Sequence, residues 1–370
     1  MKKEIQLLVI FGGRSGEHEV SLKSAASIIK AAREKKFSIT PVGITRDGVW
    51  LAESAAKTAR IAPDALPEKV LASGRPAALI PSKKGAVLID VDSKSGGGAR
   101  VICRPDVVFP VLHGTYGEDG TIQGLFEMCN IPYVGPGVLG SAVAMDKEIA
   151  KRVMRDAGMD IVPFTIWRSG DNPRKFMDEC EKEFGYPVFV KPANLGSSVG
   201  ISKAKNRAEL VKALKLAADF DRKVLVEKSV NAREIECAVL GNSKPEASVP
   251  GEVMPVNEFY DYEAKYIKEG SKTQVPADLP AAVAKMVRTQ AIRAFQVLGC
   301  EGLARADFFL ERETGRLFIN ELNTIPGFTS ISMYPMMWRH SGLSTPDLIG
   351  RLVDLAIERH REISNLRTTC

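Results

Sequence analysis

Two pairs of polar residues near the end of the sequence have types and spacing suited to chemistry on phosphates. Arg305 and Asp307 lie two residues apart in a predicted strand, and Glu321 and Asn323 repeat that spacing in the next strand. Because side chains alternate across a strand, each pair points to one face of the sheet. Asp, Glu and Asn oxygens suit magnesium that bridges substrate phosphates, but alternating polar residues also occur on solvated sheet faces. The spacing alone leaves both interpretations open.

A loop rich in glycine and serine follows a β-rich run that ends at Lys191 and Pro192. Its sequence, Asn194 to Gly200, offers backbone N–H groups that can approach an anion and hydroxyl groups that can donate to it. The chain contains no G-x-x-x-x-G-K-S/T motif, so the loop is not a Walker A loop. We interpret it as a phosphate lid, and a glycine-rich β-turn is the alternative.

Alternating strand and helix patterns predict the elements that hold these residues in a mixed α/β (α+β) fold. Ile5 to Phe11 and Ser38 to Ile44 are strand candidates, and the apolar residues between Leu22 and Ile29 have helical spacing. From 51 to 100 the pattern gives way to alanine, proline, serine and glycine, which predicts an irregular insertion. At 370 residues the chain exceeds what one core organises. We expect N-terminal, central and C-terminal domains at residues 1–137, 138–230 and 231–370.

The composition argues against several classes of protein. The 51 basic and 45 acidic side chains are interspersed and leave a formal charge of only +6, so charge gives no indication of nucleic-acid binding. No run of about 18 uncharged apolar residues occurs, and the short apolar run near the start predicts a strand rather than a targeting segment. The six cysteines form no C-x-x-C pair, which favours isolated thiols in a reducing compartment. We therefore expect a soluble protein.

Several sequence blocks occur together in one order along the chain. Lys191 stands before Gly-Ser-Ser-Val-Gly, Glu227 and Lys228 follow, and Arg-x-Asp and Glu-x-Asn-Thr come last. Four longer blocks accompany them: GGRSGEHEVS at 12–21, HGTYGEDG at 113–120, FYDYEAKY at 259–266 and NTIPGFT at 323–329. This set resembles the ATP-grasp carboxylate–amine ligases and, more narrowly, the D-alanine–D-alanine ligase family. The resemblance implies three α/β domains in an ATP-grasp architecture, with ATP between the central and C-terminal domains.

By that resemblance we expect a nucleotide site in the central region. Lys147 and Lys191 should contact the phosphates, because lysine charges offset phosphate repulsion during transfer. Ser197 and Ser198 belong to the covering loop. The adenine and ribose are expected to be held by Glu227, Lys228, the Val230 backbone and Glu234. Strand-end charges and surface lysines are the ordinary alternative for these residues.

The metal ions that the resemblance implies agree with the strand spacing. Asp307, Glu321 and Asn323 match a site for two Mg²⁺ ions, or Mn²⁺, through the same oxygens that the spacing suggested. Activation by a monovalent cation is left open. ATP and the divalent ions are the expected cofactors.

The resemblance also implies binding sites for two D-alanine molecules. Glu17 should bind the ammonium group of the first, although a carboxylate at a helix start is also favoured by the helix dipole. His113 should lie near the carboxylate of that D-alanine, although a histidine at a strand end is often structural. Lys265 and Ser332 match the residues that contact the carboxylate of the second D-alanine, and Ser332 is also a candidate helix N-cap.

The implied reaction has two steps. The carboxylate of the first D-alanine attacks the γ-phosphate of ATP, and the amine of the second D-alanine then attacks the resulting acyl phosphate. Arg305 and the Gly327 N–H are the candidates that stabilise the oxyanion. Tyr266, supported by Ser197 and Glu17, is the candidate that positions or deprotonates the amine, although tyrosine is a weak base at neutral pH. The identity of the base stays open.

The segment 258–270, with four aromatic residues among its charges, is expected to be a flap that keeps water from the acyl phosphate. An amphipathic hairpin packed on the core is the alternative. Family members that form an ester to D-lactate typically lack the Glu-Ala-Lys-Tyr of this segment, which favours the amide product and leaves D-serine open. Ile325 departs from the serine often found after Asn-Thr, but it is not a proposed ligand.

Two other classes of protein fit less well. A dinucleotide-binding oxidoreductase needs G-x-G-x-x-G after its first strand, and GGRSG at 12–16 does not supply that spacing. A nucleotide-binding module without catalysis is opposed by the intact set that includes Glu17, Arg305 and Asp307. The family further implies a homodimer that acts on small molecules in peptidoglycan synthesis in a bacterial cytoplasm, with neither nucleic acid nor membrane as a partner.

Overall fold

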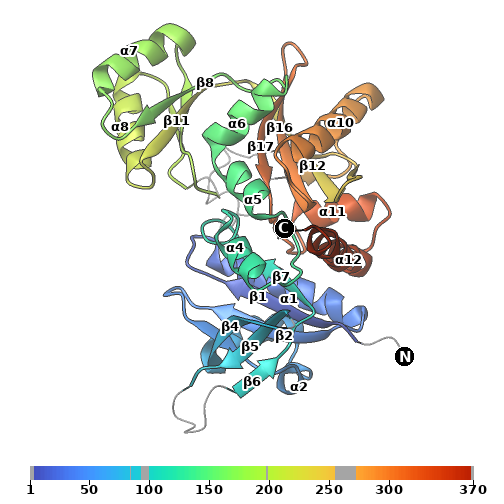
Figure 1. The fold of residues 1–370 in the computed structure, drawn as a ribbon. Coiled ribbons are helices and arrows are strands. Elements are labelled where there is room, and N and C mark those ends of the chain that lie inside the picture. The colour runs from blue at the N-terminus through green and yellow to red at the C-terminus, as the bar shows by residue number, and fades with distance from the viewer. Residues whose placement is uncertain (1–3, 84, 93–99, 197–198, 255–271, 368–370) are drawn as a thin grey trace.

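The computed structural model describes residues 4–83, 85–92, 100–196, 199–254 and 272–367. Within these ranges the strands form three sheets, of seven, four and six strands. Figure 1 shows the seven-stranded sheet at the bottom, the four-stranded sheet at the upper left and the six-stranded sheet at the upper right. Helices α5 (Val138–Met145) and α6 (Lys147–Asp156) lie between the sheets. The α/β class expected from the sequence is confirmed.

The first sheet is built around β1 (Gln6–Gly12), which pairs in parallel with β2 (Ser38–Ile44) and β7 (Val107–Val111). The apolar run that predicted β1 is buried on both faces, as expected of a central parallel strand. Its odd-numbered residues pack with α1 (His18–Glu34), and its even-numbered residues pack with α4 (Thr121–Met128). The carboxyl ends of β1 and β7 therefore emerge side by side, and the loops that follow them carry Glu17 and His113.

Most of the segment 51–100 is regular, so the expectation of an irregular insertion is wrong. Antiparallel strands extend the first sheet in the order β3 (Trp50–Ala52), β4 (Arg75–Ser82), β5 (Gly85–Asp90) and β6 (Arg100–Cys103). Between β3 and β4 lie α2 (Ala55–Thr58), η1 (Pro63–Ala65) and α3 (Leu66–Ser73). Prolines at 76 and 81 weaken the strand signal of β4, and the pairing with β5 that stabilises it is not encoded in local composition.

The second sheet is small and antiparallel, in the order β10-β9-β11-β8. Its strands are β8 (Phe164–Arg168), β9 (Val188–Pro192), β10 (Ser202–Ala204) and β11 (Lys223–Lys228). Helices α7 (Pro173–Phe184) and α8 (Arg207–Ala218) share a separate apolar core with it. In the antiparallel register Lys191 on β9 lies opposite Leu225 on β11, so Glu227, two residues further along β11, lies diagonally beside Lys191 on the same face of the sheet.

The third sheet carries the two polar pairs. Its strands are β12 (Ala232–Gly241), β13 (Glu246–Ala247), β14 (Gly251–Met254), β15 (Lys272–Gln274), β16 (Gly302–Glu311) and β17 (Leu317–Asn323). Helices α6 and α10 (Ala281–Val297) share one core with it. Helices α11 (Met333–His340) and α12 (Thr345–Ser364) contribute to a second core that also contains α1 and β1. The first and third sheets are thus joined through a common apolar core.

No helix in the described ranges combines the length and the apolar character needed to cross a membrane.

Candidate active site

Strands β16 and β17 bring the two predicted polar pairs together. Arg305 lies opposite Asn323, and Asp307 lies opposite Glu321, in the strand register. The buried Asn323 Oδ1 has no hydrogen-bond partner within the described part of the chain. An acceptor oxygen without a donor, next to carboxylates, fits a cation ligand.

The same oxygens do not form a complete cage. In the described ranges, no three His, Cys, Asp or Glu side chains are close enough to hold a metal ion by themselves. Magnesium commonly retains waters and takes phosphate oxygens, so a partial protein ligand set suits it. The donor set of Asp307, Glu321 and Asn323 therefore fits a divalent cation that arrives with a phosphate.

Arg305 is held by carboxylates on two strands. Its Nε and Nη2 donate to the two oxygens of Asp307 at 2.7 and 2.6 Å, and its Nε lies 3.1 Å from Glu236 Oε2 on β12. Burial acts to lower the pKa of Arg305, but Asp307 and Glu236 overcome it and raise that pKa well above the ordinary value. A permanent positive charge is thus fixed beside the carboxylates of Asp307 and Glu236.

A buried cluster of one carboxylate and two ammonium groups lies at the neighbouring edge of the second sheet. Glu227 forms ion pairs with Lys191 and with Lys151, the latter at 2.7 Å, and the Lys151 and Glu227 side chains are only 1% and 2% exposed. Burial would raise the pKa of Glu227, but Lys151 and Lys191 lower it to about 2. Burial, together with the charge of Lys191, lowers the pKa of Lys151 although Glu227 opposes this, whereas Glu227 raises the pKa of Lys191 against the effect of burial. Lys191 is therefore the positively charged member of the cluster.

The other residues expected around adenine and ribose follow directly along the chain. Lys228 ends β11 and is exposed, Val230 is half-buried in the turn, and Glu234 is half-buried on β12. The carboxylates of Glu234 and Glu321 both act to raise the pKa of Lys191. The nucleotide candidates and the metal candidates are therefore electrostatic neighbours.

The start of α6 is tied to the loop that follows β9. Lys147 N–H donates to Ala193 O at 3.0 Å, its Nζ donates to Leu195 O at 2.5 Å, and that Nζ lies 4.0 Å from Glu321 Oε2. The side chain of Lys147 thus reaches from the glycine-rich loop toward the metal candidates.

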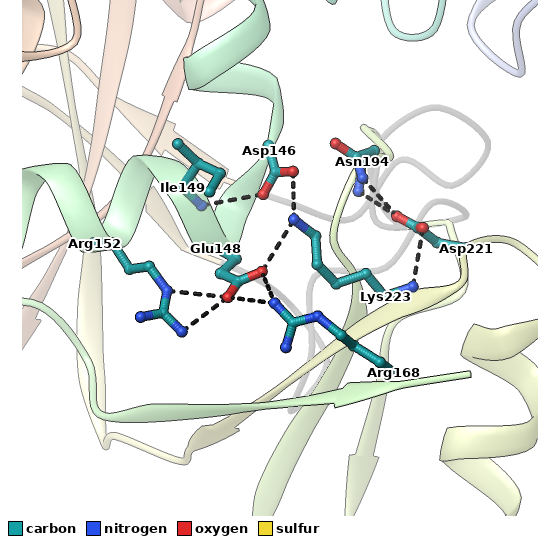
Figure 2. Close-up of polar contacts among 8 residues, drawn as sticks. All are labelled: Asp146, Glu148, Ile149, Arg152, Arg168, Asn194, Asp221 and Lys223. Atoms are coloured by element: carbon teal, nitrogen blue, oxygen red, sulfur yellow. Dashed lines mark hydrogen bonds and ion pairs between the residues drawn. The ribbon is translucent and has the colours of Figure 1, made fainter. Parts of the chain in front are cut away.

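Figure 2 shows the ion-pair network that holds this junction. Lys223 Nζ on β11 lies 2.5 Å from Asp146 and 3.1 Å from Glu148, and Glu148 also pairs with Arg168 on β8. Asp146 caps α6 by accepting a bond from Ile149 N–H at 3.1 Å. The network fixes the first turn of α6, and with it Lys147, against the second sheet.

Glu17 lies at the N-cap position of α1, where loops from the first and second sheets meet. A Cβ atom at Gly114 or Gly196 would lie 2.9 or 3.0 Å from Glu17 Oε2, so only glycine leaves the carboxylate its room. Beside it lies a cavity of about 520 Å³. The lining includes Glu17, Gly114, Thr115, Gly196 and Val199.

His113 is buried and joins three parts of the chain. Its Nδ1 lies 2.8 Å from Ile325 O and its Nε2 lies 3.2 Å from Ser24 Oγ on α1. Because a carbonyl only accepts, Nδ1 carries the proton and Ser24 donates to Nε2. Ser24 Oγ accepts a bond from Phe328 N–H at 3.1 Å. Burial lowers the pKa of His113, so the ring is neutral and is satisfied within the described structure.

Gly327 and Ser332 lie together in the loop between β17 and α11. A Cβ atom at Gly327 would lie 2.9 Å from Ser332 Oγ. Ser332 occupies the N-cap position of α11 but makes no side-chain capping bond to that helix, and its Oγ accepts from Thr329 N–H at 3.0 Å instead. The loop is therefore folded back on itself next to Ser24 and His113.

Four predicted site residues, Ser197, Ser198, Lys265 and Tyr266, lie outside the described residues, as does the segment expected to form the flap. Two buried charged residues of the site were absent from the sequence prediction. Lys151 follows Lys147 by four residues, which places it on the same helix face, and Glu118 lies within the HGTYGEDG block. The helical spacing of Lys151 and the place of Glu118 in that block could have identified both residues from the sequence.

Comparisons with known proteins cover almost the whole chain. The profile of the D-ala D-ala ligase N-terminus matches residues 6–136, and that of the D-ala D-ala ligase C-terminus matches residues 153–354. A D-alanine–D-alanine ligase of Acetivibrio thermocellus is 50% identical, covering 96% of this chain and 97% of that one. D-alanine–D-alanine ligase A of Salmonella typhimurium is 45% identical, with 99% of each chain covered.

Solved structures of similar fold include ligases with the same kind of name. The D-alanine-D-alanine ligase of Coxiella burnetii matches with a TM-score of 0.83 and 37% identity over 98% of this chain and 96% of that one. The VanG D-Ala:D-Ser ligase of Enterococcus faecalis matches with a TM-score of 0.80 and 36% identity over 96% of this chain and 100% of that one. The two matched profiles and the full-length relatives show that the chain belongs to the D-alanine–D-alanine ligase family.

Proposed function

We propose that this chain joins two D-alanine molecules into D-alanyl-D-alanine, with ATP converted to ADP and phosphate. One observation carries the proposal: the cavity beside Glu17 is lined from both matched family regions, by Glu17 and Gly114 from the first and by Gly196 and Val199 from the second. A carboxylate that can bind an ammonium group thereby faces a glycine-rich loop that can bind a phosphate. We take the parts of the site to be a domain at 1–137, a central domain at 138–230 and a C-terminal domain at 231–370.

In this proposal the nucleotide lies between the second and third sheets. Lys147 and Lys191 contact its phosphates, and Ser197 and Ser198 cover them from the loop. The raised pKa of Lys191 supports this assignment, because it keeps a positive charge where a phosphate would bind. The adenine and ribose are bound by Glu227, Lys228, the Val230 backbone and Glu234.

Asp307, Glu321 and Asn323 are the proposed ligands of two Mg²⁺ ions, with Mn²⁺ as a substitute. The buried Asn323 Oδ1, which has no hydrogen-bond partner among the described residues, supports this assignment. The ions, when bound, would neutralise charge on the phosphates of ATP during transfer. A monovalent cation as a further activator is tested by exchange of K⁺ for Na⁺ in the assay.

The first D-alanine is proposed to bind with its ammonium group on Glu17 and its carboxylate toward the γ-phosphate. His113 acts mainly by holding the loops around it, since both ring nitrogens already contact Ser24 and Ile325. Attack of the D-alanine carboxylate on the γ-phosphate breaks the bond to ADP. The carboxyl group becomes an acyl phosphate, which has a good leaving group.

The second D-alanine then attacks the acyl carbon with its amine, and phosphate leaves with the bonding electrons. Arg305 and the Gly327 N–H are proposed to stabilise the oxyanion, and loss of one such donor typically costs about 3–4 kcal/mol of barrier. Tyr266, with Ser197 and Glu17, is proposed to orient the amine and take its proton. Lys265 and Ser332 are proposed to bind the carboxylate of the second D-alanine.

We further propose that the chain works as a homodimer in the bacterial cytoplasm, where its dipeptide enters peptidoglycan precursors. Size-exclusion chromatography with light scattering tests the oligomeric state: a mass near 80 kDa is expected from the 40.3 kDa chain, and a single-chain mass would contradict the dimer.

The direct test of the activity is product analysis by mass spectrometry with Mg-ATP and D-alanine. D-alanyl-D-alanine and ADP should form in equal amounts, and L-alanine should give neither product. The absence of dipeptide under these conditions would reject the proposal.

D-Serine as second substrate is the alternative, and the similarity to the D-Ala:D-Ser ligase of Enterococcus faecalis favours including it. Equimolar D-alanine and D-serine should yield mainly D-alanyl-D-alanine. A mixed dipeptide in excess would make the alternative the better description. A third reaction, with D-lactate, should yield no ester.

A further inference from the structure

Glu118 is a buried carboxylate that binds two loops from distant parts of the chain. Its Oε2 accepts a bond from Gly114 N–H at 2.6 Å, and its Oε1 accepts one from Ile325 N–H at 2.8 Å. Glu118 lies between β7 and α4 in the chain, and only 7% of the residue is exposed. One side chain therefore links the loop after β7 to the loop after β17.

Both loops carry groups of the proposed reaction. Gly114 lies against the Glu17 carboxylate, the proposed ammonium ligand, and Ile325 lies between Asn323 and Gly327. Ile325 is fixed on both sides, because its N–H donates to Glu118 while its C=O accepts from His113 Nδ1 at 2.8 Å. Glu118 and His113 thus set how far the first D-alanine site lies from the oxyanion donors.

The chemistry of Glu118 is specific to a carboxylate. Two separate oxygens accept from two separate N–H groups, whereas an amide has one acceptor oxygen and would turn its NH₂ group toward the other N–H. The surroundings disfavour the charged form. Burial and, after it, the charge of Glu17 raise the pKa of Glu118 to about 8, although the Gly114 and Ile325 N–H groups and Arg305 act to lower it. The chain nevertheless has an ionisable group here rather than a neutral one.

We propose that Glu118 is a positioning residue for the ligation, which holds the loops 113–117 and 323–329 in register across the site without touching substrate. This inference rests on the proposed function. It predicts a defect in the use of D-alanine rather than in the use of ATP, because the nucleotide candidates Lys147, Lys191 and Glu227 lie on other elements.

The test is Glu118→Gln, with Glu127→Gln as the matched control. Glu127 lies on α4 in the same part of the first domain, and its side chain accepts a hydrogen bond from Tyr133 OH at 2.6 Å, a residue of neither loop. Displacement of reacting groups by about 1 Å costs about 100-fold. We expect kcat/KM for D-alanine to fall by about that factor in Glu118→Gln and the KM for ATP to change less than about 2-fold. Glu127→Gln should keep kcat/KM for D-alanine within about 2-fold.

A pH profile separates positioning from simple support of the fold. When Glu118 is protonated, one of its oxygens is an O–H that faces an N–H donor, so both bonds are complete only in the ionised form. Wild-type kcat/KM for D-alanine should rise with pH toward about 8, and this limb should be missing in Glu118→Gln.

The outcomes are distinguishable from failure of the proposed function. If the wild type makes no dipeptide, the proposed function is wrong and this inference goes with it. If the wild type is active and Glu118→Gln keeps its kcat/KM, or loses ATP and D-alanine use equally, Glu118 is not a positioning residue. Should Glu118→Gln not fold, Glu118→Asp is the second variant: its shorter carboxylate cannot reach both N–H groups, so unchanged kinetics there would equally overturn the inference.

Discussion

The guanidinium of Arg305 holds both carboxylate oxygens of Asp307, two residues away on β16, at 2.7 and 2.6 Å. The proposed oxyanion donor and a proposed metal ligand thus neutralise each other when no cation is present. If Asp307 binds a divalent ion as proposed, that ion would compete with Arg305 for it, and Glu236, 3.1 Å from Arg305 Nε, would still hold the arginine. The proposed metal site and the placement of Arg305 would then be coupled.

Asp307→Asn should weaken the use of metal. The amide keeps one acceptor oxygen but loses the negative charge that attracts the cation, so the Mg²⁺ concentration for half-maximal activity should rise by at least about 10-fold. A magnesium titration at saturating ATP measures this, and binding of Mn²⁺ followed by electron paramagnetic resonance provides a readout besides activity.

Asp160→Asn is the control for that substitution, because Asp160 and Arg316 form a similar pair at 2.8 Å on the surface, with both side chains 57% exposed. It should leave the magnesium dependence unchanged. Equal effects of the two substitutions would remove Asp307 from the proposed ligand set.

Arg305→Lys should lower kcat while leaving the KM for ATP nearly unchanged. Lysine keeps the charge but cannot present two parallel N–H donors, and the loss of one oxyanion donor typically costs a factor of about 100–1,000 in kcat. Steady-state kinetics with D-alanine at several fixed ATP concentrations separates the two constants. A large rise in the KM for ATP with normal kcat would instead place Arg305 at the nucleotide.

Glu227→Gln should destabilise the chain, because it removes the buried carboxylate that pairs with both Lys151 and Lys191. Removal of one partner from a buried ion cluster typically costs about 3–5 kcal/mol. Adding Lys151→Met to that variant removes one of the two buried charges and should restore part of the loss. Urea unfolding of the single and double variants measures the coupling.

Glu246→Gln is the control for Glu227→Gln, since Glu246 pairs with Arg351 at the surface and such pairs contribute little. If the double variant is as unstable as the sum of the single ones, the three charges do not act as a cluster.

The pH dependence of stability should contain opposite contributions from the two buried glutamates. Glu118 has its pKa raised from 4.5 to about 8, so its folded form binds the proton more tightly, and stability falls as pH rises from 4.5 to 8. Glu227 has its pKa lowered to about 2, so its contribution is present above pH 4.5 and is lost as pH falls toward 2.

Chemical unfolding across pH 2–9 measures these contributions. Glu118→Gln should flatten the alkaline side only, and Glu227→Gln should flatten the acid side only. Glu17→Gln should make the alkaline decrease in stability end at a lower pH than in the wild type. The reason is that the charge of Glu17 is one of the causes that raise the pKa of Glu118. Identical profiles for wild type and both glutamate variants would contradict the assigned shifts.

The parts of the fold that are coded locally were predictable from the sequence. The apolar run at 5–11 became β1, and the spacing of Arg305 with Asp307 and of Glu321 with Asn323 became two facing pairs in the strand register. The spacing sufficed there because the period of a strand fixes which side chains share a face.

Relationships that depend on pairing between distant segments were not predictable in the same way. Nothing in the spacing relates Glu118 to Ile325, and the hydrogen bond between them exists because two sheets share a core. Strand β4 was missed for a similar reason, since its pairing with β5 stabilises a segment that contains two prolines. The sequence resemblance supplied roles for residues, but it did not supply the contacts that hold them.

The shared core of α1, β1, α11 and α12 has a consequence for how the chain is made. Synthesis completes the first sheet's parallel strands by residue 111, but α12 begins only at Thr345. Until then the α1 side of the nascent chain lacks the helices that cover it, and exposed apolar surface of this kind promotes aggregation. Chains cut short before Thr345 should therefore need chaperones or be degraded, even though every residue of their first sheet is present.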